Sequence, residues 1–301
     1  MLVTRKNKIR VLFILFAVVV PVVNWFIFYI YANIEAILMA FQDVNGNWTL
    51  RNFTRFFGEF TMETSDIKLA LTNTFLTFAI LFITYPFKVL VSYFIYKKVP
   101  GASFYRIVFF IPSILFSICT VMMFSRIVGV NGFIAKAIQE AKGLEYVPEL
   151  LGHSDYANTV VLCHLLWLGF PGDLIVWGGT FARIPVEVLE SGELDGTSWW
   201  TEFTKIIVPM VWPTVALQMV LLFCGIFGAS GAVFLLTGGG YGTMTLNAWM
   251  YIELYENSGA GYASGAHNYL SAVGMMMTIV AVCISLGIRK ITDKMFDEVE
   301  F

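Results

Sequence analysis

Long apolar stretches recur along this chain, and they constrain its fold more than any other feature. A helix needs roughly 20 apolar residues to cross a bilayer, because in lipid every backbone amide and carbonyl must be paired inside the helix. With 58% hydrophobic and 13% charged residues among 301, the chain has more apolar surface than one soluble core can bury. We therefore expect an all-α membrane protein with six transmembrane helices, at residues 11–31, 70–96, 107–128, 159–181, 207–236 and 269–288.

Basic residues gather on one side of these predicted helices. If the helices alternate in direction, one side receives Arg5, Lys6, Lys8, Arg10, Lys97, Lys98, Arg106, Arg183, Lys205, Arg289, Lys290 and Lys294. The other side receives half as many, namely Arg51, Arg55, Lys68, Arg126, Lys136 and Lys142. Short cytoplasmic loops are enriched in lysine and arginine. We therefore predict a multi-pass protein of the cell membrane, inner or cytoplasmic, with both termini in the cytoplasm.

The first apolar stretch follows a basic leader, as the core of a cleaved secretory signal does. It is longer than such a core, contains Pro21 and Asn24, and lacks a small-residue cleavage site. We expect it to be a retained helix. Residues 1–301 are then interpreted as a single transmembrane domain.

The four cysteines each fall in a different predicted span, and the three histidines are scattered. Metal and redox sites need closely spaced ligands or thiols, and this spacing does not supply them. The sequence predicts no metal site and no catalytic residue, and it predicts that the cysteines are small packing residues.

A short polar loop, residues 183–209, separates the fourth and fifth apolar stretches. Within it Glu187, Glu190 and Glu193 recur every three residues, a spacing that places three carboxylates along one helix face. The basic-residue pattern puts this loop in the cytoplasm. Such a face repels itself unless water or a basic surface covers it.

Small residues stand beside that acidic stripe and a helix end follows it. Ser191 and Gly192 would let another protein approach the backbone closely. Asp195-Gly196 predicts the helix end, because glycine tolerates the left-handed conformation of a C-cap. The residues alone leave two alternatives open, a docking helix for a soluble partner and an amphipathic connector between two membrane helices.

The loop resembles the signature loop of binding-protein-dependent ABC transporter permeases, and within them the carbohydrate branch to which the maltose permeases belong. The matching pattern is Glu190-Ser191-Gly192, two residues, Asp195-Gly196, then Phe203, Ile206, Pro209 and Pro213. Ser191 and Gly192 depart from the usual alanines, and Val208 departs from the usual leucine. These changes keep the residues small and uncharged.

The resemblance implies a type I ABC importer permease fold with a cytoplasmic coupling helix between helices four and five. Its implied ATPase-coupling residues are Glu187, Glu190, Ser191, Gly192, Asp195 and Gly196. The implied partners are a second permease subunit, two ATP-binding subunits and an extracytoplasmic solute-binding protein, with no nucleic acid. ATP and Mg would belong to the partner ATPase, and the chain, which has no G-x-x-x-x-G-K-S/T loop, would bind no cofactor.

Polar and aromatic residues inside the predicted spans are candidates for a substrate pathway. A sugar site combines an aromatic platform with hydrogen-bonding groups, and Trp167, Gln218 and Ser230 could supply these, with Ser113 and Ser117 from the third span. Asp173 is an intramembrane acid, either a cargo contact, a carboxylate paired across helices, or a group close enough to water to stay solvated.

Three further intramembrane residues belong to this set, namely two neighbours of Trp167 and one lysine. Leu168 and Gly169 match positions that contribute the sugar site in maltose-type permeases, by resemblance. Lys88 is expected to extend its amine to the cytoplasmic interface. All of these positions also have a packing interpretation, so they remain candidates.

The function predicted is a permease subunit of an ATP-driven importer for sugars, in particular oligosaccharides, in contact with membrane lipid. Alternatives are an ABC permease for a phosphorylated polyol, peptide or amino acid, and a stand-alone ion-coupled carrier. A carrier needs paired intramembrane acids and bases, of which only Asp173 stands out. A membrane enzyme ranks last, because His, Asp and Cys do not cluster.

Overall fold

The structure, a computed structural model, describes residues 5–62, 65–143, 145–146, 148–255 and 265–295. Within that part, six helical stretches are long and apolar enough to cross a membrane. They are Leu12–Ala40, Asp66–Tyr96, Ser117–Lys142, Ser154–Phe181, Trp199–Cys224 and Ala266–Thr292. The predicted all-α architecture with six spans is confirmed, and the chain divides into two compact units.

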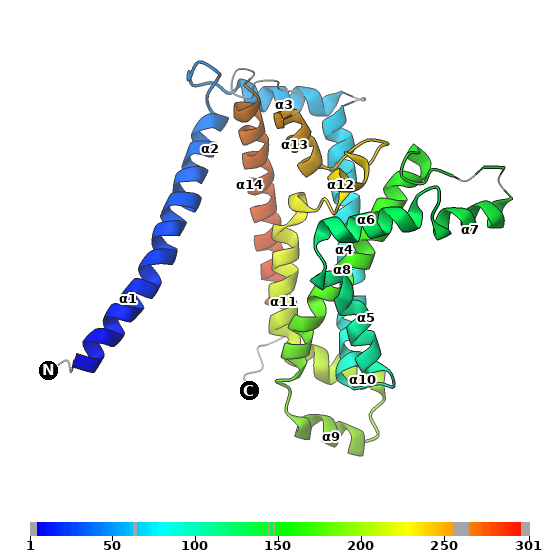
Figure 1. The fold of residues 1–301 in the computed structure, drawn as a ribbon. Helices are drawn as coiled ribbons and strands as arrows, with labels where there is room; N and C mark the ends of the chain where they lie inside the picture. Colours follow the sequence, from blue (N-terminus) through cyan, green and yellow to red (C-terminus); the bar gives the residue numbers. More distant parts are fainter. Residues whose placement is uncertain (1–4, 63–64, 144, 147, 256–264, 296–301) are drawn as a thin grey trace. The chain divides into compact units, whose positions relative to one another are not determined.

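The first unit comprises residues 1–61 and 252–278. A long continuous helix opens it (Figure 1). This helix is built from α1 (Arg5–Trp25), the π-helical segment η1 (Phe26–Tyr31) and α2 (Ala32–Ala40).

A short amphipathic helix, α3 (Arg51–Thr61), follows and is fixed to the start of α14 (Ala266–Thr292). Arg55 pairs with Glu59 at 2.7 Å, and its guanidinium lies 4.0 Å above the ring of Tyr269. The Tyr269 hydroxyl donates to Glu59 at 2.6 Å. A charged network therefore holds the non-membrane helix of this unit in place.

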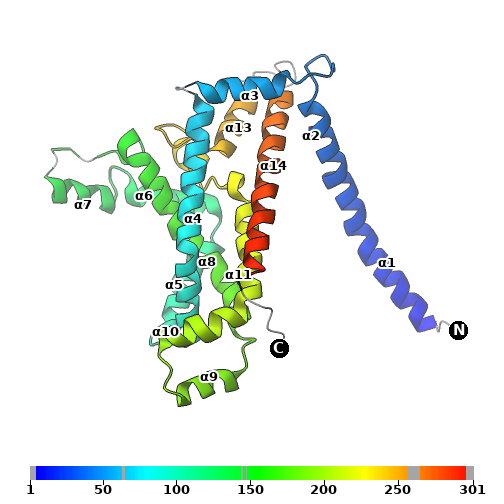
Figure 2. The same ribbon diagram turned by 180° about the vertical axis from the view of Figure 1, so that it is seen from behind.

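The second unit comprises residues 62–251 and 279–301 and carries the loop of interest. Its long helices α4 (Asp66–Tyr96) and α8 (Ser154–Phe181) run side by side, as Figures 1 and 2 both show. The other elements are α5 (Ala102–Ile114), α6 (Ser117–Val128), α7 (Phe133–Lys142), α9 (Val186–Leu194), α10 (Trp199–Glu202), the π-helical η2 (Phe203–Ile207), α11 (Val208–Cys224), the 3-10 turn η3 (Ile226–Gly228) and α12 (Val233–Thr237). Helices α13 (Leu246–Tyr255) and α14 belong to both units.

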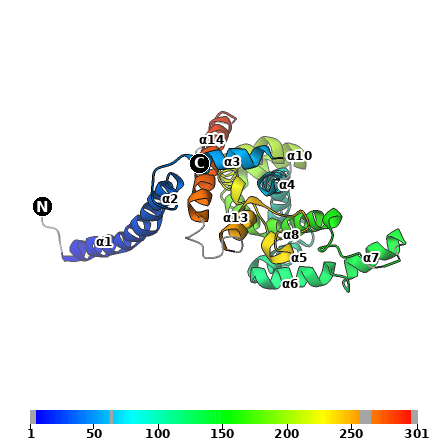
Figure 3. The same ribbon diagram turned by 90° about the horizontal axis from the view of Figure 1, so that it is seen from above.

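The third predicted span, 107–128, is not one helix. It is divided between α5, which also packs on α8, and α6, and Leu115 and Phe116 are extended between them (Figure 3). Pro112 lacks the amide that would bond to the carbonyl four residues earlier, which weakens the last turn of α5. The prediction of a continuous helix was wrong here because hydropathy does not register a missing donor.

The fifth predicted span, 207–236, was also wrong at both ends. The continuous helix begins at Trp199 and ends at Cys224. Gly225, Gly228 and Gly231 follow within seven residues, and Gly231 has a φ of +56°, which an uninterrupted right-handed helix does not contain. Glycine destabilises a helix by about 1 kcal/mol relative to alanine, so three in succession end it despite the apolar residues between them.

The cysteines do not pack inside the chain, contrary to expectation. Cys119, Cys163, Cys224 and Cys283 are all free and exposed. Each lies on a helix face that turns away from the chain's own core.

Candidate functional site

The helix predicted in the loop 183–209 is present as α9, which stands beyond the ends of α8 and α10 (Figure 2). It begins after Pro185, whose extended backbone (φ −58°, ψ 133°) separates it from α8. Glu187 and Glu190 lie on its exposed surface. A nine-residue helix is too short to be stable in water on its own, so its surroundings must hold it.

Gly196 closes α9 in the way the sequence predicts. Its φ is +68°, and its amide donates to the carbonyl of Glu193 at 3.1 Å. The amide of Thr197 donates to the carbonyl of Gly192 at 3.0 Å. These two bonds form a Schellman motif, which satisfies carbonyls that a helix end leaves unpaired. A side chain at position 196 would strain this left-handed turn.

The acidic stripe is not uniformly free, because Lys97 at the end of α4 reaches into the loop. Its amine lies 3.2 Å from the carboxylate of Glu193 and 3.0 Å from that of Glu202 in α10. Glu202 is only 4% exposed. Lys97 thus ties both ends of the loop to α4. Glu193 is paired although it is exposed, and Glu187 and Glu190 are the carboxylates of the stripe that form no ion pair with the described residues.

Lys97 stays charged in this position. Burial lowers the pKa of its amine, but pairing with the carboxylates of Glu202 and Glu193 outweighs that cost and raises the pKa above its usual range. A raised lysine pKa means that the stabilisation is complete at neutral pH and is lost only in strongly alkaline solution. This role of Lys97 has no local signal in the sequence, because its partners lie about one hundred residues away.

Gly192 packs against the loop itself, although its small size suggested an open approach for another protein. A Cβ atom built on Gly192 lies 3.4 Å from Cδ1 of Ile206 and 3.8 Å from Oγ1 of Thr197. Ser191 is exposed, and its hydroxyl donates to the carbonyl of Val188. The small residue at 192 therefore lets α9 lie close to the helix that enters the membrane.

An aromatic cluster mounts the loop on the membrane helices. Ring centroids lie 5.2 Å apart for Tyr93 and Phe203, and 5.4 Å apart for Phe94 and Trp199. Tyr96 and Phe181 are 5.6 Å apart. These contacts join the ends of α4 and α8 to the helix after the loop. The segment that follows the loop is therefore packed on the ends of two membrane helices.

Two exposed apolar residues lie at the ends of α9 and were not among the predicted site residues. Leu194 is 89% exposed and Val186 is 58% exposed. Apolar side chains flanking exposed carboxylates form a surface suited to a protein partner. The signal was present in the sequence, since a connector of this length offers no core in which Leu194 could be buried.

Asp173 on α8 pairs with Lys88 on α4. Of its three interpretations, the contacts match a carboxylate paired across helices. The amine of Lys88 donates to the carboxylate of Asp173 at 2.9 Å. Lys88 is 8% exposed, so the expectation that its amine reaches the interface was wrong. A Cβ atom on Gly169 would lie 3.6 Å from that amine, so the absence of a side chain there makes room for the pair.

Two more polar atoms lie near this ion pair. The hydroxyl of Tyr85 and the indole nitrogen of Trp177 are buried and have no hydrogen-bond partner among the described residues. Buried donors are rarely left unpaired in folded proteins. Together with the partly exposed Asp173, they form a polar patch between α4 and α8.

The remaining pathway candidates do not join that patch. Trp167 is 37% exposed and stacks on Phe124 with ring centroids 6.0 Å apart. Leu168 is partly buried beside it. Gln218 in α11 and Ser230 after η3 are partly buried, and in the described part of the chain neither has a hydrogen bond to the other candidates. The structure thus brings Gly169 and Asp173 together and leaves the others apart.

Replacing Asp173 with asparagine tests the ion pair. The variant keeps the volume but leaves the Lys88 amine without a counter-ion, and we expect it to lower the free energy of unfolding by about 1–3 kcal/mol. Unfolding by denaturing detergent measures the change. Asp155→Asn in the same helix is the control, because Asp155 is 72% exposed. An equal effect in both variants would contradict the pairing.

No family model matches the chain. The multiple sugar-binding transport system permease protein MsmF of Streptococcus mutans is 23% identical over 198 residues, which cover 65% of this chain and 66% of that protein. The maltose/maltodextrin permease MalF of Vibrio parahaemolyticus is 28% identical over 153 residues, 50% of this chain and 29% of that protein.

A third relative is the osmoprotective compounds uptake permease GgtC of Synechocystis, 29% identical over 126 residues, 40% of this chain and 44% of that protein. The chain thus spans less than two thirds of the length of the curated relatives it matches. All three are named as permeases of uptake or transport systems. The resemblance carried by the loop motif is confirmed by this group.

A solved structure resembles the chain over almost its whole length. It is a chain of the bacterial alginate ABC transporter crystallised in complex with an alginate pentasaccharide-bound periplasmic protein. The TM-score is 0.77, the match covers 98% of this chain and 99% of that chain, and 19% of residues are identical. The expected ABC importer permease fold is confirmed.

Proposed function

We propose that this chain, a permease of the binding-protein-dependent ABC importer family, forms half of the translocation pathway of an ATP-driven importer of oligosaccharides. The observation that carries the proposal is the geometry of α9. It presents Glu187, Glu190 and Leu194 to the outside while Lys97 and the aromatic cluster fix it to the membrane helices. A helix that is both exposed and rigidly mounted suits the transmission of force.

The proposed coupling step needs a separate ATP-binding subunit. That subunit receives α9 in a cleft, contacts the exposed carboxylates and Leu194, and supplies ATP and Mg. Ser191 and Asp195 lie on the exposed part of the loop, and Gly192 and Gly196 keep it compact. This chain binds no cofactor in the proposal, and its role is mechanical.

Movement of α9 reaches the pathway through the contacts at its base. Lys97 joins the loop to α4, and Tyr93 joins α4 to Phe203 after the loop. The same α4 carries Lys88, whose partner Asp173 lies on α8. We infer that closure of the ATP-binding subunits shifts these helices as a group and opens the pathway alternately to each side of the membrane.

The proposed assembly contains a second permease, two ATP-binding subunits and an extracytoplasmic solute-binding protein. The loop 183–209 and both termini face the cytoplasm in this arrangement. The excess of basic residues on that side supports it. The alginate transporter, a structural relative, is named as a complex with a periplasmic protein.

Sugar cargo is supported by the names of the relatives and by the side chains of the candidate pathway. The relatives include multiple-sugar and maltose/maltodextrin permeases. Trp167, which is partly exposed, would offer a flat ring to the apolar face of a sugar. Asp173, Gln218 and Ser230 would supply hydrogen bonds, with Leu168 and Gly169 shaping the wall beside them.

Two other functions have a specific observation in their favour. The relative named for osmoprotective compounds supports import of a small non-sugar solute by the same mechanism. The Lys88–Asp173 pair supplies the intramembrane acid and base that an ion-coupled carrier needs. In the carrier, transport would proceed without ATP.

Uptake by proteoliposomes distinguishes these functions. The chain, its partner permease, the ATP-binding subunits and the solute-binding protein are reconstituted with radiolabelled maltooligosaccharides, galactooligosaccharides, alginate oligosaccharides or glycine betaine. The proposal predicts uptake of an oligosaccharide that requires both ATP and the binding protein. Uptake by this chain alone under a proton or sodium gradient would contradict it, and uptake of glycine betaine alone would favour the non-sugar importer.

A further inference from the structure

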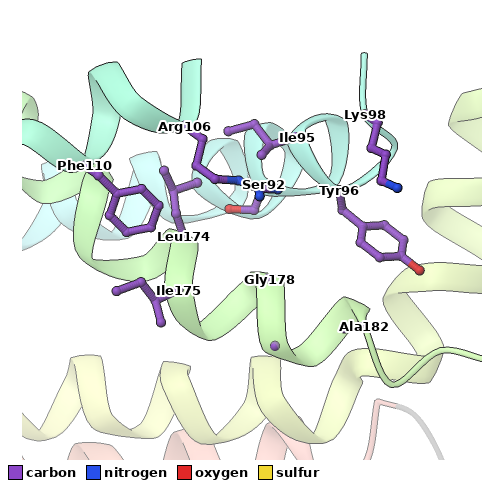
Figure 4. Close-up of a pocket in the computed structure, with 11 residues that line it drawn as sticks. Ser92, Ile95, Tyr96, Lys98, Arg106, Phe110, Leu174, Ile175, Gly178 and Ala182 are labelled. Carbon is purple, nitrogen blue, oxygen red and sulfur yellow. The ribbon is translucent and has the colours of Figure 1, made fainter. Parts of the chain in front are cut away.

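A cavity of about 410 Å³ lies among α4, α5 and α8, at the end of the second unit where α4 meets the loop (Figure 4). Ile95, Phe110, Leu174 and Ile175 give it apolar walls. Lys98 and Arg106 are the charged residues in its lining. Figure 4 shows Arg106 extending over the cavity toward Ser92, and Lys98 at one end of it.

The two cations of this lining have no acidic partner in the described part of the chain. Lys97, next to Lys98, pairs with two carboxylates, whereas no ion pair joins Lys98 or Arg106 to any described residue. The lining contains no aspartate or glutamate. The cavity therefore has a positive electrostatic potential and attracts an anion.

The backbone at Lys98 gives a second, independent observation. The amide of Lys98 donates to the carbonyl of Ile95, and the amide of Val99 donates to that of Phe94, so α4 ends in a Schellman motif. Gly196 occupies the equivalent left-handed position after α9, and Gly143 and Gly238 do so after α7 and α12. Lys98 holds a φ of +54° where glycine would be unstrained.

A left-handed conformation costs lysine more free energy than it costs glycine. We therefore look to the Lys98 side chain for the reason that lysine occupies this position. Residues in strained conformations concentrate where function requires them. The turn directs Lys98 to the cavity, where it joins Arg106 from the following helix. Two cations from different segments of the chain thus line one cavity whose other walls are largely apolar.

The level of the cavity in the membrane indicates what kind of anion fits. The membrane-spanning helix α4 ends at Tyr96, so Lys98 lies at the boundary between lipid and water. Below it, a Cβ atom built on Gly178 or Gly179 would meet nothing within 4 Å, which leaves an open floor beside Leu174 and Ile175. A ligand with an anionic head and an apolar tail matches this arrangement.

We propose that this cavity binds one anionic phospholipid, with its phosphate between Lys98 and Arg106 and the start of an acyl chain over Gly178 and Gly179. Basic pockets between membrane helices at the cytoplasmic face have the chemistry to bind such head groups. The lipid would fill the space between α4, α5 and α8 and support the helices that carry the loop. The site does not depend on which solute the protein transports.

Native mass spectrometry of the purified, delipidated importer complex tests this site. The probes are 1-palmitoyl-2-oleoyl phosphatidylglycerol and the phosphatidylcholine with the same chains. We expect the wild type to bind one phosphatidylglycerol at least tenfold more tightly. Lys98→Gly should weaken that binding about fivefold, and Lys98→Gly with Arg106→Gln roughly 30-fold, because each cation near the surface contributes about a factor of five.

The controls separate lipid binding from folding and from general charge. Lys98→Gly relieves the left-handed strain, so it should fold at least as well as the wild type. Lys205→Gln removes an exposed cation from the helix after the loop and should leave lipid binding unchanged. Equal binding of phosphatidylcholine, or full phosphatidylglycerol binding by the double variant, would overturn the proposal. Lipid binding by the isolated chain but not by the assembled complex would also overturn it, because the second permease would then occupy the cavity.

Discussion

Replacing Glu190 with lysine is expected to reduce ATP-dependent uptake by the reconstituted importer at least about 30-fold while the chain still inserts and folds. Glu190 is exposed on α9 and has no hydrogen bond or ion pair to the described residues, so its loss costs the isolated chain little. In a docked helix the same change puts a cation into a contact built for a carboxylate. Reversal of a charge buried in an interface costs about 2–5 kcal/mol, which gives the stated factor at its lower limit.

The control for this experiment is Glu140→Lys. Glu140 is an exposed carboxylate on α7, outside the loop, and its reversal makes the same change in net charge. Uptake and basal ATP hydrolysis are measured for both variants in the same vesicles. Normal uptake by Glu190→Lys, or equal loss in both variants, would contradict a docking role for α9.

The second large effect is expected from Lys97→Met. This change leaves the carboxylate of Glu202, which is 4% exposed, without its cation. Breaking one partner of a buried ion pair costs about 3–5 kcal/mol. Because Lys97 keeps a quarter of its side chain exposed, we expect a loss near 3 kcal/mol in the free energy of unfolding. Denaturing-detergent titration of the purified chain measures it.

The double variant Lys97→Met with Glu202→Met separates pairing from packing. Replacing both charges by apolar groups removes the unpaired carboxylate, and most of the lost stability should return. Glu193→Gln is the matched control, since Glu193 contacts the same amine but is 68% exposed, and it should cost under about 1 kcal/mol. A double variant as unstable as Lys97→Met would show that Lys97 acts through something other than this pair.

Much of the fold was predictable because the signals are local. Apolar length predicts the membrane helices directly, and the second, fourth and sixth spans begin and end within about five residues of their predicted bounds. The first span continues to Ala40, since its polar residues Asn33 and Glu35 lowered the apparent apolar length without ending the helix. The Schellman closure at Gly196 follows from the residue type alone.

The errors have two physical causes: hydropathy does not register local changes in hydrogen bonding, and ion pairs join residues far apart in the sequence. The proline in α5 and the glycines after α11 change hydrogen bonding without lowering hydropathy. Two spans were therefore predicted as continuous helices where the structure has a break. Lys97 and Lys88 meet carboxylates about one hundred residues away. No local pattern distinguishes a paired lysine from one that reaches for water.

The candidate site was predicted in outline and corrected in detail. The acidic residues of α9 were identified from their spacing, but in the structure Glu193 is paired with Lys97 and Gly192 packs against Ile206. Leu194 was overlooked because attention to charge hides an exposed apolar residue between carboxylates. The surface offered to a partner is therefore partly acidic and partly apolar.

The contact between α9 and the ATP-binding subunit is tested most directly by photo-crosslinking from Leu194 in the assembled importer. A photoreactive amino acid replaces Leu194, which is 89% exposed, and in a control it replaces Phe133 of α7, which is 81% exposed. We expect a crosslink from position 194 to the ATP-binding subunit and none to that subunit from position 133. A crosslink from position 194 to the solute-binding protein, or to no other subunit, would contradict it.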